Sequence, residues 1–411
     1  MSDFFSIQLE VNQAFKTQLL QWASKFSTFS FLDSNDTRDA HSGYDFILAA
    51  DVLAFYTSLE ELPKDKFLFG HFGYHFNTEH KGREPFIDYR KCHFFEPRYV
   101  IYAQQGRLYF NRNAPESLEI LDIILAQTLV DNRLPKIDFY ARTSANQYSE
   151  NILEIQRAIR NGQFYELNYC IEFYKDKVHI HPVQTFLEIN QAAGAPMSAL
   201  VKYNDKWVLS FSPERLAKLN DNKLISQPMK GTARRDLINI THDEQIKQEL
   251  AHSIKERAEN TMIVDLVRHD MTRYAHTGSI RVEEWCQVYS FPFVHQMIST
   301  ISAELQDINN SHNALKALLP AGSMTGAPKK EVIQFIEKIE NFGRGLYAGN
   351  IGYFAPDGNF DFNVVIRSLY YDEKAEKISL AVGGAITLLS DPEKEYQECL
   401  IKAEGILKFF K

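Results

Sequence analysis

A lysine in an unusual turn is the first residue of this chain that could do chemistry. Residues 227–236 read QPMKGTARRD, and Lys230 lies between an apolar methionine and a glycine. Proline, glycine and threonine favour a turn, and turn residues are usually solvated and polar. An amine held in a site can instead act as a nucleophile once it has lost its proton. Both interpretations of Lys230 are open at this point.

Two stretches carry carboxylates at helical spacing. Glu395, Glu398 and Lys402 are three and four residues apart in DPEKEYQECLIKAEGILKFF, so they share one face of a predicted helix. Glu256 and Glu259 repeat the spacing in KERAEN. Such residues usually form a solvated stripe, with Glu398 and Lys402 paired for roughly 0.2–0.5 kcal/mol. Two such helices could also close on Mg²⁺, which favours a few carboxylates plus water and substrate oxygens.

Small-residue segments and isolated polar residues indicate a site for a small polyanion. Residues 321–328, AGSMTGAP, and the loop around residues 382–385, VGGA, expose N–H groups that suit a carboxylate or phosphate, although either could be a plain connection. Arg367 lies in the apolar strand NVVIRSLYY and requires an anionic partner. His295 in FPFVHQMIST is more often a core histidine than a catalyst. Glu214 in FSPERL is weak evidence alone.

The composition excludes several classes of protein. The 411 residues carry 45 Lys and Arg against 53 Asp and Glu, a net charge of −8, with no basic block, which argues against a nucleic-acid binder. Hydrophobic residues make up 45%, enough for a large core. No signal peptide is visible, and no run approaches the roughly 18 apolar residues of a membrane span. Four scattered cysteines fit a reducing compartment, so we expect a cytoplasmic protein.

Helices and strands must position these residues, and the pattern predicts where they lie. Hairpins followed by helices favour an α+β architecture with largely antiparallel sheets. The expected elements are a strand over 98–104, helices over 149–160, over 241–262 and from 328, strands over 346–354, 360–368 and 378–386, and a last helix from a capping box at 390–393. The main boundary is expected near residue 145.

Seven segments of the chain resemble, in order, the chorismate-utilising enzymes. They are SPERLAKL, QPMKGT, KERAENTMIVDLVRHDMTR, AGSMTGAPKKEVIQFIE, RGLYAGNIGYF, FNVVIRSLYY and SDPEKEYQECLIKA, and the resemblance covers about residues 150–409. It implies two largely antiparallel β-sheets packed together, with helices outside. Residues 1–145 would form an N-terminal region and residues 146–411 the catalytic region, interleaved in one globular unit. In the first, only FSFLDSND, residues 29–36, resembles a segment that helps relatives hold a tryptophan-sized ligand.

The resemblance implies a role for each polar residue picked out above. Members of the family bind chorismate with Mg²⁺ and displace or move its C4 hydroxyl. Glu259 and Glu398 match the metal-binding glutamates. Glu214 matches the acid that assists departure of the hydroxyl, and His295 matches the active-site histidine. The substrate contacts that the resemblance implies are Gly231, Thr232, Ser323, Tyr347, Arg367, Gly383, Gly384, Glu395 and Lys402.

Two positions indicate the branch of the family. Relatives that use water as the nucleophile activate it with a lysine, but the matching position here is Glu166. Lys230 stands where the aminodeoxychorismate branch has lysine and the anthranilate branch has alanine. The resemblance therefore implies that Lys230 attacks C2 of chorismate while the C4 hydroxyl leaves with a proton from Glu214. Ammonia then adds at C4 and expels the lysine.

This chemistry requires opposite pKa shifts at two groups. Lys230 must be neutral to attack, so we expect burial and the nearby Arg234 and Arg235 to lower its pKa. Glu214 must hold its proton until the hydroxyl leaves, so we expect its pKa to be raised.

Ammonia must reach the site from elsewhere. Neither Cys92 in RKCHFF nor Cys170 in NYCIE resembles an amidotransferase nucleophile, so the resemblance implies a separate glutamine amidotransferase subunit, replaceable by free ammonium. A lyase acting next would release pyruvate and form 4-aminobenzoate for folate. Anthranilate synthase component I is the alternative, and Lys230 argues against it. A non-catalytic chorismate- or tryptophan-binding subunit is disfavoured because the metal glutamates and Glu214 are present.

Four positions depart from the family pattern. His269 stands where relatives usually have Asn, and Thr272 where Gly is common. Ala385 and Leu389 replace the usual glycine and acidic residue around the final loop. None removes a catalytic group, and any effect would fall on carboxylate contacts and loop conformation.

Overall fold

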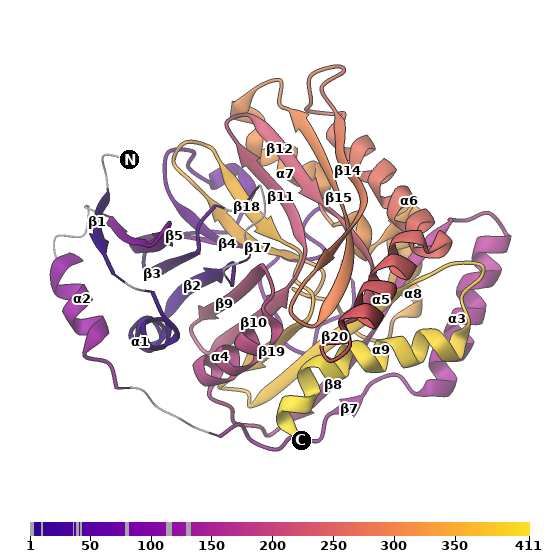
Figure 1. Ribbon diagram of the computed structural model, residues 1–411, viewed down its shortest axis with the longest axis horizontal. Helices are drawn as coiled ribbons and strands as arrows, with labels where there is room; N and C mark the ends of the chain where they lie inside the picture. Colours follow the sequence, from indigo (N-terminus) through magenta and orange to yellow (C-terminus); the bar gives the residue numbers. More distant parts are fainter. Residues whose placement is uncertain are drawn as a thin grey trace.

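The computed structural model describes residues 4–9, 11–35, 37, 41, 43–78, 82–111, 117–128 and 133–411 (Figure 1). Its helices are α1 (Gln13–Ala23), α2 (Ser117–Leu125), α3 (Ala145–Arg160), α4 (Pro182–Ala193), α5 (Ile240–His252), α6 (Ile254–Met271), α7 (Ser311–Leu318), α8 (Lys329–Ile339) and α9 (Pro392–Leu407). Its strands are β1 (Phe4–Gln8), β2 (Thr28–Asp33), β3 (Phe46–Tyr56), β4 (Leu68–Phe72), β5 (Cys92–Gln104), β6 (Arg107–Asn111), β7 (Tyr140–Ala141), β8 (Glu166–Asp176), β9 (Met197–Tyr203), β10 (Lys206–Ser212), β11 (Arg215–Asn220), β12 (Lys223–Gln227), β13 (Met229–Arg234), β14 (Arg281–Ser290), β15 (Val294–Glu304), β16 (Gly326–Ala327), β17 (Asn350–Phe354), β18 (Phe360–Asn363), β19 (Ser368–Asp372) and β20 (Lys377–Ile386).

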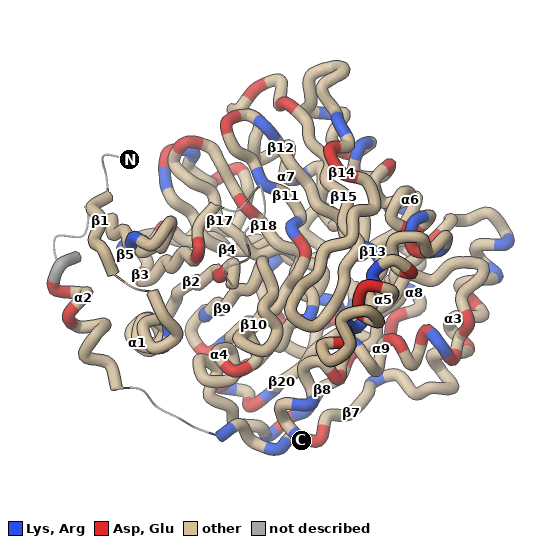
Figure 2. Tube along the Cα trace, in the orientation of Figure 1, with Lys and Arg blue, Asp and Glu red and all other residues tan. Residues whose placement is uncertain are grey.

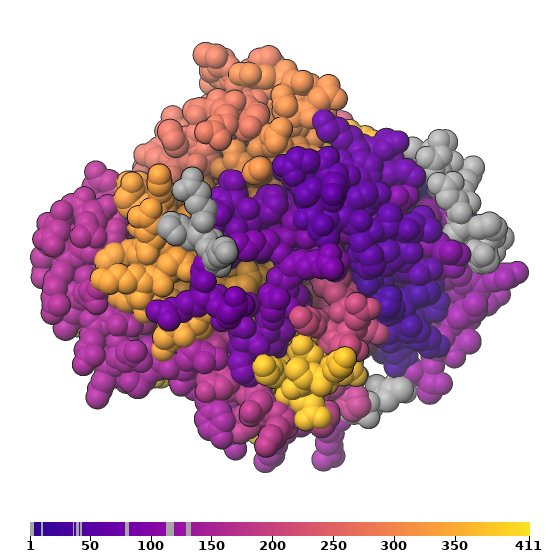
Figure 3. Space-filling model, turned by 180° about the vertical axis from the view of Figure 1, so that it is seen from behind, coloured from indigo at the N-terminus to yellow at the C-terminus, as the bar shows by residue number. Residues whose placement is uncertain are grey.

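The described strands pair in antiparallel fashion and join into one network that divides at β5. One sheet runs in the order β1, β6, β5, β3, β2, β9, β10, β19, β20, β8. The other runs from β5 through β4, β17, β18, β11, β12 and β15 to β14, and β13 continues the edge that β12 forms with β15. Strands from the first third of the chain thus pair with later strands in both sheets, β2 with β9 and β4 with β17. Seen from behind, the early residues spread over much of this face (Figure 3).

The two sheets pack face to face around a large apolar core. Alternate residues of β9 face opposite ways, so Ala199 and Val201 lie in this core with Phe362 of β18, whereas Leu200 lies on the other side. Helices cover that other side through Leu19 of α1, Ile152 of α3, Phe186 of α4, Val332 of α8 and Cys399 of α9. The predicted α+β fold of two antiparallel sheets with helices outside is confirmed.

Local signals explain several confirmed elements. Helix α3 begins after Ser144, whose side chain accepts from the backbone N–H of the third residue on. Asp391 caps α9 in the same way, one residue beyond the expected Ser390, and a proline follows at the first helical position. The predicted hairpin forms as β17 and β18. In the part of the chain that is described, no helix is long and apolar enough to cross a membrane.

The single helix predicted over residues 241–262 is wrong, because the chain forms two helices there. Asn239 caps α5, and Ser253 interrupts the helical path with extended angles of φ −61° and ψ 115°. The Ser253 side chain accepts from the backbone N–H of Glu256 and so begins α6 afresh. The direction of the chain changes at this point, and Ile254, expected in the buried stripe, is 86% exposed.

Candidate active site

Lys230 on β13 forms a buried ion pair with the first residue of β8. Its Nζ donates to Glu166 Oε1 at 2.8 Å, and the two side chains are 10% and 1% exposed respectively. The second carboxylate oxygen, Glu166 Oε2, is buried and has no hydrogen-bond partner among the described residues. A charged amine is buried only where an opposite charge compensates for lost water. Lys230 is therefore held in a site and is not an ordinary surface lysine.

The protonation of Lys230 differs from the sequence expectation. Burial by itself lowers the pKa of Lys230, but the carboxylates around it, with Glu166 and then Glu259 contributing most, raise that pKa above its usual value. Arg234, one of the two arginines expected to lower it, is exposed. Arg235, the other, donates to an aspartate of α5. The prediction of a lowered pKa is wrong because carboxylates, not cations, surround the amine.

Glu214 lies between β10 and β11 and faces the same cluster. Ser323 Oγ donates to Glu214 Oε1 at 2.7 Å. Burial raises the pKa of Glu214 to about 7, an effect that Ser323 and the positive charges of Lys230 and Arg367 only partly oppose. The predicted upward shift is confirmed. A carboxyl group with such a pKa can give a proton near neutral pH and then recover it.

Arg367 occupies a break between two strands, so the strand predicted to run through it is wrong. β18 ends at Asn363 and β19 begins at Ser368, and Arg367 has a φ of +51° between them. Strained backbone of this kind clusters at functional sites. Burial lowers the pKa of Arg367, and the nearby Glu214 opposes this shift. The guanidinium donates to Gln296 Oε1 at 3.5 Å, a long contact that leaves it suited to bind a ligand carboxylate.

Carboxylates of α6 and α9 lie close together, so the two predicted helices do meet. The Lys255 ammonium lies 3.8 Å from Glu259 Oε1 and 3.5 Å from Glu395 Oε1, and so links the helices. Burial acts to lower the pKa of Lys255, but these two glutamates together with Glu256 and Glu398 raise it. Figure 2 shows both acidic and basic residues on α5 and α9. The position between the helices therefore attracts a cation.

These carboxylates fit a divalent cation that takes further ligands from water or substrate. Burial raises the pKa of Glu259 to about 7, and Glu259 Oε1 has no hydrogen-bond partner within the described ranges. A bound cation would satisfy that buried oxygen. In the described part of the chain, no three His, Cys, Asp or Glu side chains form a group that could hold a metal by themselves. A metal here would need further ligands from water or substrate, as Mg²⁺ does when it binds one or two carboxylates, and binding of Mg²⁺ stays a prediction.

Gly383 and Gly384 lie within β20, so the strand predicted over 378–386 is confirmed and the loop suggested around residues 382–385 is wrong. Both residues pair with β8. Lys402 of α9 donates to Gly383 O at 2.9 Å and lies 2.7 Å from Glu398 Oε1. A Cβ at Gly384 would lie 3.5 Å from Glu395 Oε2. Gly384 thus faces α9, and the hydrogen bond from Lys402 links that helix to the backbone of β20.

Tyr347 lies against the pair of strands β8 and β20, on the side that faces away from α9. It is buried, and its hydroxyl donates to Cys170 Sγ at 3.6 Å. Cys170 in turn faces Gly383, where a Cβ would lie 2.4 Å from the sulfur. Burial raises the pKa of Tyr347 well above its usual value. The contact of Tyr347 with a substrate carboxylate stays a prediction.

Gln296 of β15 is a site residue that the sequence did not single out. Thr232 Oγ1 donates to Gln296 Oε1 at 2.9 Å, and Gln296 Nε2 donates to Gly231 O at 2.9 Å. The same amide oxygen receives the long contact from Arg367. One amide thus ties the backbone of β13 beside Lys230 to the guanidinium. The turn predicted around Lys230 is wrong, because Met229–Arg234 form this strand.

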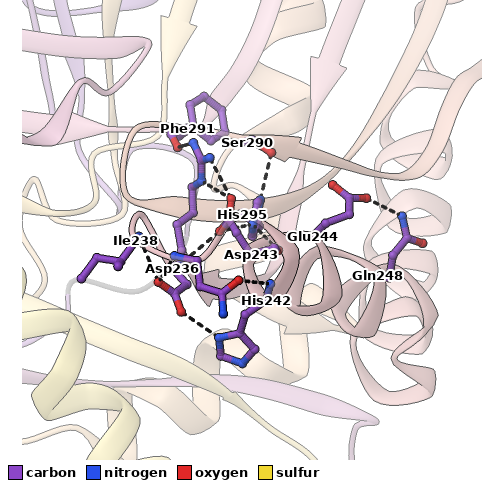
Figure 4. A network of polar contacts seen from close by, with 11 residues as sticks. Asp236, Ile238, His242, Asp243, Glu244, Gln248, Ser290, Phe291 and His295 are labelled. Carbon is purple, nitrogen blue, oxygen red and sulfur yellow. Dashed lines mark hydrogen bonds and ion pairs between the residues drawn. The ribbon is translucent and has the colours of Figure 1, made fainter.

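His295 belongs to a separate network on α5 and the turn between β14 and β15 (Figure 4). One ring nitrogen contacts Ser290 Oγ at 2.9 Å, and the other contacts Asp243 Oδ1 at 3.0 Å. Asp243 also accepts from Arg235. Neighbouring residues of a strand point to opposite faces, so His295 faces away from Gln296 and the Lys230 cluster. The catalytic role of His295 stays a prediction.

Gly231 allows the backbone after Lys230 to pass close to α6. It has a φ of +78°, and a Cβ there would lie 2.9 Å from Glu256 Oε2. We expect Gly231→Ala to destabilise the fold by about 1–2 kcal/mol through backbone strain alone. Displacement of Glu256 should also disturb the carboxylate cluster and so lower any turnover that depends on it.

Gly106→Ala is the matched control for this substitution. Gly106 has a φ of +73°, but no atom lies within 4 Å of the position its Cβ would take. Thermal unfolding should therefore show comparable strain in both variants, whereas turnover should fall only for Gly231→Ala. Equal turnover in the two variants would show that the contact with Glu256 is unimportant.

A family model for chorismate binding enzymes matches residues 13–408. This chain belongs to that family. It is 38% identical over 281 residues to an aminodeoxychorismate synthase of Streptomyces pristinaespiralis and 37% identical over 271 residues to aminodeoxychorismate synthase component 1 of Escherichia coli (strain K12). The alignments cover 68% and 66% of this chain but 38% and 59% of those proteins. The chain thus spans less than two thirds of the length of these relatives.

A solved structure of the family agrees with the fold. Anthranilate synthase component I from Streptococcus pneumoniae superposes with a TM-score of 0.79 over 90% of this chain and 93% of that chain, at 22% identity. The superposition shows that this chain shares its two-sheet architecture with that structure.

The departures from the family pattern lie at the periphery of the cluster. His269 and Thr272 are exposed near the end of α6, where Thr272 Oγ1 donates to His269 O at 2.6 Å. Leu389 is 91% exposed in the turn before α9. Ala385 lies in β20, directly after the two glycines. Of these four residues, only Ala385 is close to the predicted substrate contacts.

The N-terminal segment that resembles a ligand-binding motif largely forms β2. Asp33 accepts from Lys16 at 2.9 Å and from Asn190 at 3.0 Å, so protein donors satisfy its carboxylate. Asp36, the last residue of the segment, lies outside the described residues. Binding of a tryptophan-sized ligand stays a prediction.

Proposed function

We propose that this chain converts chorismate and ammonia to 4-amino-4-deoxychorismate. The observation that supports this most directly is the buried amine of Lys230 within electrostatic reach of Glu214, a carboxyl group with a pKa of about 7. An amine and a proton donor in one cluster supply the nucleophile and the acid that a two-step displacement requires. Two relatives with 37–38% identity bear the name aminodeoxychorismate synthase.

In the first half of the reaction, Lys230 Nζ bonds to C2 of chorismate. The two ring double bonds shift, and the C4–O bond breaks. Glu214 gives its proton to the departing hydroxyl, which leaves as water. The ring is then attached to the protein through Lys230.

In the second half, an ammonium ion gives a proton to Glu214 and attacks C4 as ammonia. The ring double bonds shift back, and the C2–N bond breaks with its electron pair on Nζ. Two successive displacements place the new amino group on the face that the hydroxyl left. Glu214 is protonated again and ready for the next substrate.

The other residues of the cluster would orient chorismate. Arg367, Lys402 and the backbone around Gly384 offer donors to its carboxylates, and Ser323 holds Glu214 toward the C4 hydroxyl. Thr232 and Tyr347 are assigned polar contacts with the substrate.

Mg²⁺ would be held by Glu259 and Glu398, with Glu256 and Glu395 beside them. When bound, it supplies positive charge next to a substrate carboxylate.

A separate glutamine amidotransferase subunit would supply the ammonia in the cytoplasm. The name component 1 of the Escherichia coli relative supports a protein of more than one component. A lyase that removes pyruvate would then yield 4-aminobenzoate for folate synthesis.

Product identification tests the proposal. The pure chain is incubated with chorismate, Mg²⁺ and ammonium, and the products are analysed by mass spectrometry with and without an aminodeoxychorismate lyase. We expect aminodeoxychorismate, which the lyase converts to 4-aminobenzoate, and we expect no product when a chelator replaces Mg²⁺. Anthranilate as the product would refute the proposal. Failure with both ammonium and an amidotransferase partner would refute catalysis.

A further inference from the structure

We propose that Glu166 is the proton acceptor that converts the Lys230 ammonium into a nucleophile. This inference rests on the proposed function, in which Lys230 attacks chorismate. Nζ and Glu166 Oε1 are 2.8 Å apart, the length of a direct hydrogen bond along which a proton can move. Glu166 thereby contacts the reacting atom itself.

The backbone holds Glu166 in a fixed position. Ala327 of β16 pairs with Glu166, and Tyr165 donates its N–H to Ala327 O at 2.8 Å. Gly326 has a φ of +140°, and a Cβ there would lie 2.1 Å from Glu166 O, so only glycine permits this close pairing. The pairing with β16 therefore fixes the backbone of Glu166 at the point where its side chain meets Lys230.

The carboxylate of Glu166 is enclosed by the protein. Its side chain is 1% exposed, and the buried Oε2 has no hydrogen-bond partner among the residues that the structure describes. Nζ and Oε1 are already joined by a hydrogen bond, so the proton has a direct path from the amine to the carboxylate. Oε2 makes no competing hydrogen bond among the described residues.

The proton balance closes within one turnover. An N–H bond of Nζ breaks and an O–H bond forms on Glu166, which leaves a neutral amine and a neutral acid. The amine attacks C2 and becomes a secondary ammonium. When the C2–N bond later breaks, Nζ keeps the electron pair and takes the proton back from Glu166. No oxidant or further reactant is required.

Several other charges face Lys230 and determine what happens without Glu166. They are Glu214 before β11, Glu256 and Glu259 of α6, and Glu398 of α9. In a Glu166→Gln variant these carboxylates remain and keep the ammonium protonated at neutral pH. The variant must then lose the proton to water before each attack.

The experiment follows a single turnover without ammonium. Excess protein is mixed with chorismate and Mg²⁺, the loss of chorismate is followed over a range of pH, and the adduct on Lys230 is detected by mass spectrometry of the intact chain. We expect Glu166→Gln to slow adduct formation at neutral pH by roughly 10²–10⁴-fold, the usual effect of losing a general base. The difference in rate between Glu166→Gln and the unchanged protein should become smaller as pH rises.

Glu172→Gln is the matched control. Glu172 is a buried glutamate of the same strand, but it pairs with Arg142 at 2.6 Å and lies outside the cluster. This control should form the adduct at the normal rate at every pH. The rate of each variant is divided by the rate of the unchanged protein at the same pH. This ratio removes the effect of the titration of Glu214, which occurs in all of these proteins.

The outcomes separate this inference from the proposed function. An unaltered rate and pH profile in Glu166→Gln would overturn the inference while leaving the product test untouched. Aminodeoxychorismate formed without any adduct on Lys230 would overturn both the lysine step and the inference. If circular dichroism shows that Glu166→Gln is unfolded, Glu166→Asp replaces it. The Glu166→Asp variant should form the adduct more slowly than the unchanged protein, with the same dependence of the rate on pH. A rate deficit that disappears as pH rises would overturn the inference.

Discussion

Replacing Lys230 with methionine should abolish formation of aminodeoxychorismate, a loss on the order of 10³-fold or more, as for other enzymes deprived of their nucleophile. Methionine fills a similar volume but cannot bond to C2 of chorismate. The substitution also leaves Glu166 buried without its ammonium. Removing one partner of a buried ion pair typically costs about 3–5 kcal/mol. The single variant should therefore be both inactive and less stable.

A double variant separates these two effects. Lys230→Met combined with Glu166→Gln removes the uncompensated charge, so thermal stability should recover while activity stays absent. Lys223→Met is the control, because Lys223 lies on the preceding strand in an exposed pair with Glu283. Activity should be assayed with chorismate, Mg²⁺ and ammonium. Recovery of activity together with stability would mean that Lys230 supports the fold and takes no part in the chemistry.

Replacing Glu214 with glutamine should lower turnover by about 10²–10⁴-fold, because the departing hydroxyl loses its proton donor. Glutamine keeps a partner for Ser323, so binding of chorismate should change little. In the unchanged protein the carboxyl must be protonated to act. Turnover should therefore fall as pH rises through about 7, the pKa of Glu214. The Gln variant should lack this decline.

The same titration should appear in stability. Burial raises the pKa of Glu214 in the folded chain to about 7, above its ordinary value near 4.5. Its contribution to stability is complete below the ordinary pKa and is lost as pH rises through about 7. The test compares melting temperatures from pH 5 to 8 for the unchanged protein, Glu214→Gln and the control Glu172→Gln. The melting temperature of the unchanged protein should fall as pH rises, and that of Glu214→Gln should fall less. A smaller pH dependence in the control would point to Glu172 as the source.

Local sequence patterns predicted much of the fold. The predictions that failed did so because the information they needed was not local. The helix over 149–160 and the hairpin of β17 and β18 depend on periodicity and on nearby turn residues, which the sequence displays. The break at Ser253 was invisible because serine is compatible with a helix and Ile254 continues the apolar spacing. The pairing of β2 with β9 was equally hidden, since strands carry no mark of a distant partner.

The candidate site shows the same division between local and distant information. Residue types and spacing made Lys230 and the glutamates of α6 and α9 candidates, whereas the roles of these residues and of Glu214 came from the resemblance to the family. The expected pKa of Lys230 was wrong because Arg234 and Arg235 are neighbours along the chain, whereas Glu166, 64 residues away, is the neighbour in space. Glu166 had a signal, since a glutamate that opens an apolar strand needs a cation. Gln296 and Lys255 had none beyond their polarity.

The pairing of early strands with late ones makes the first third of the chain indispensable for a reason unrelated to chemistry. A catalytic fragment starting at residue 146 would lose β2 and β4 and expose the edges of β9 and β17. Unpaired edges recruit other chains and lead to aggregation. Backbone pairing constrains side-chain identity only loosely. We therefore expect the region to tolerate many substitutions but not its own removal.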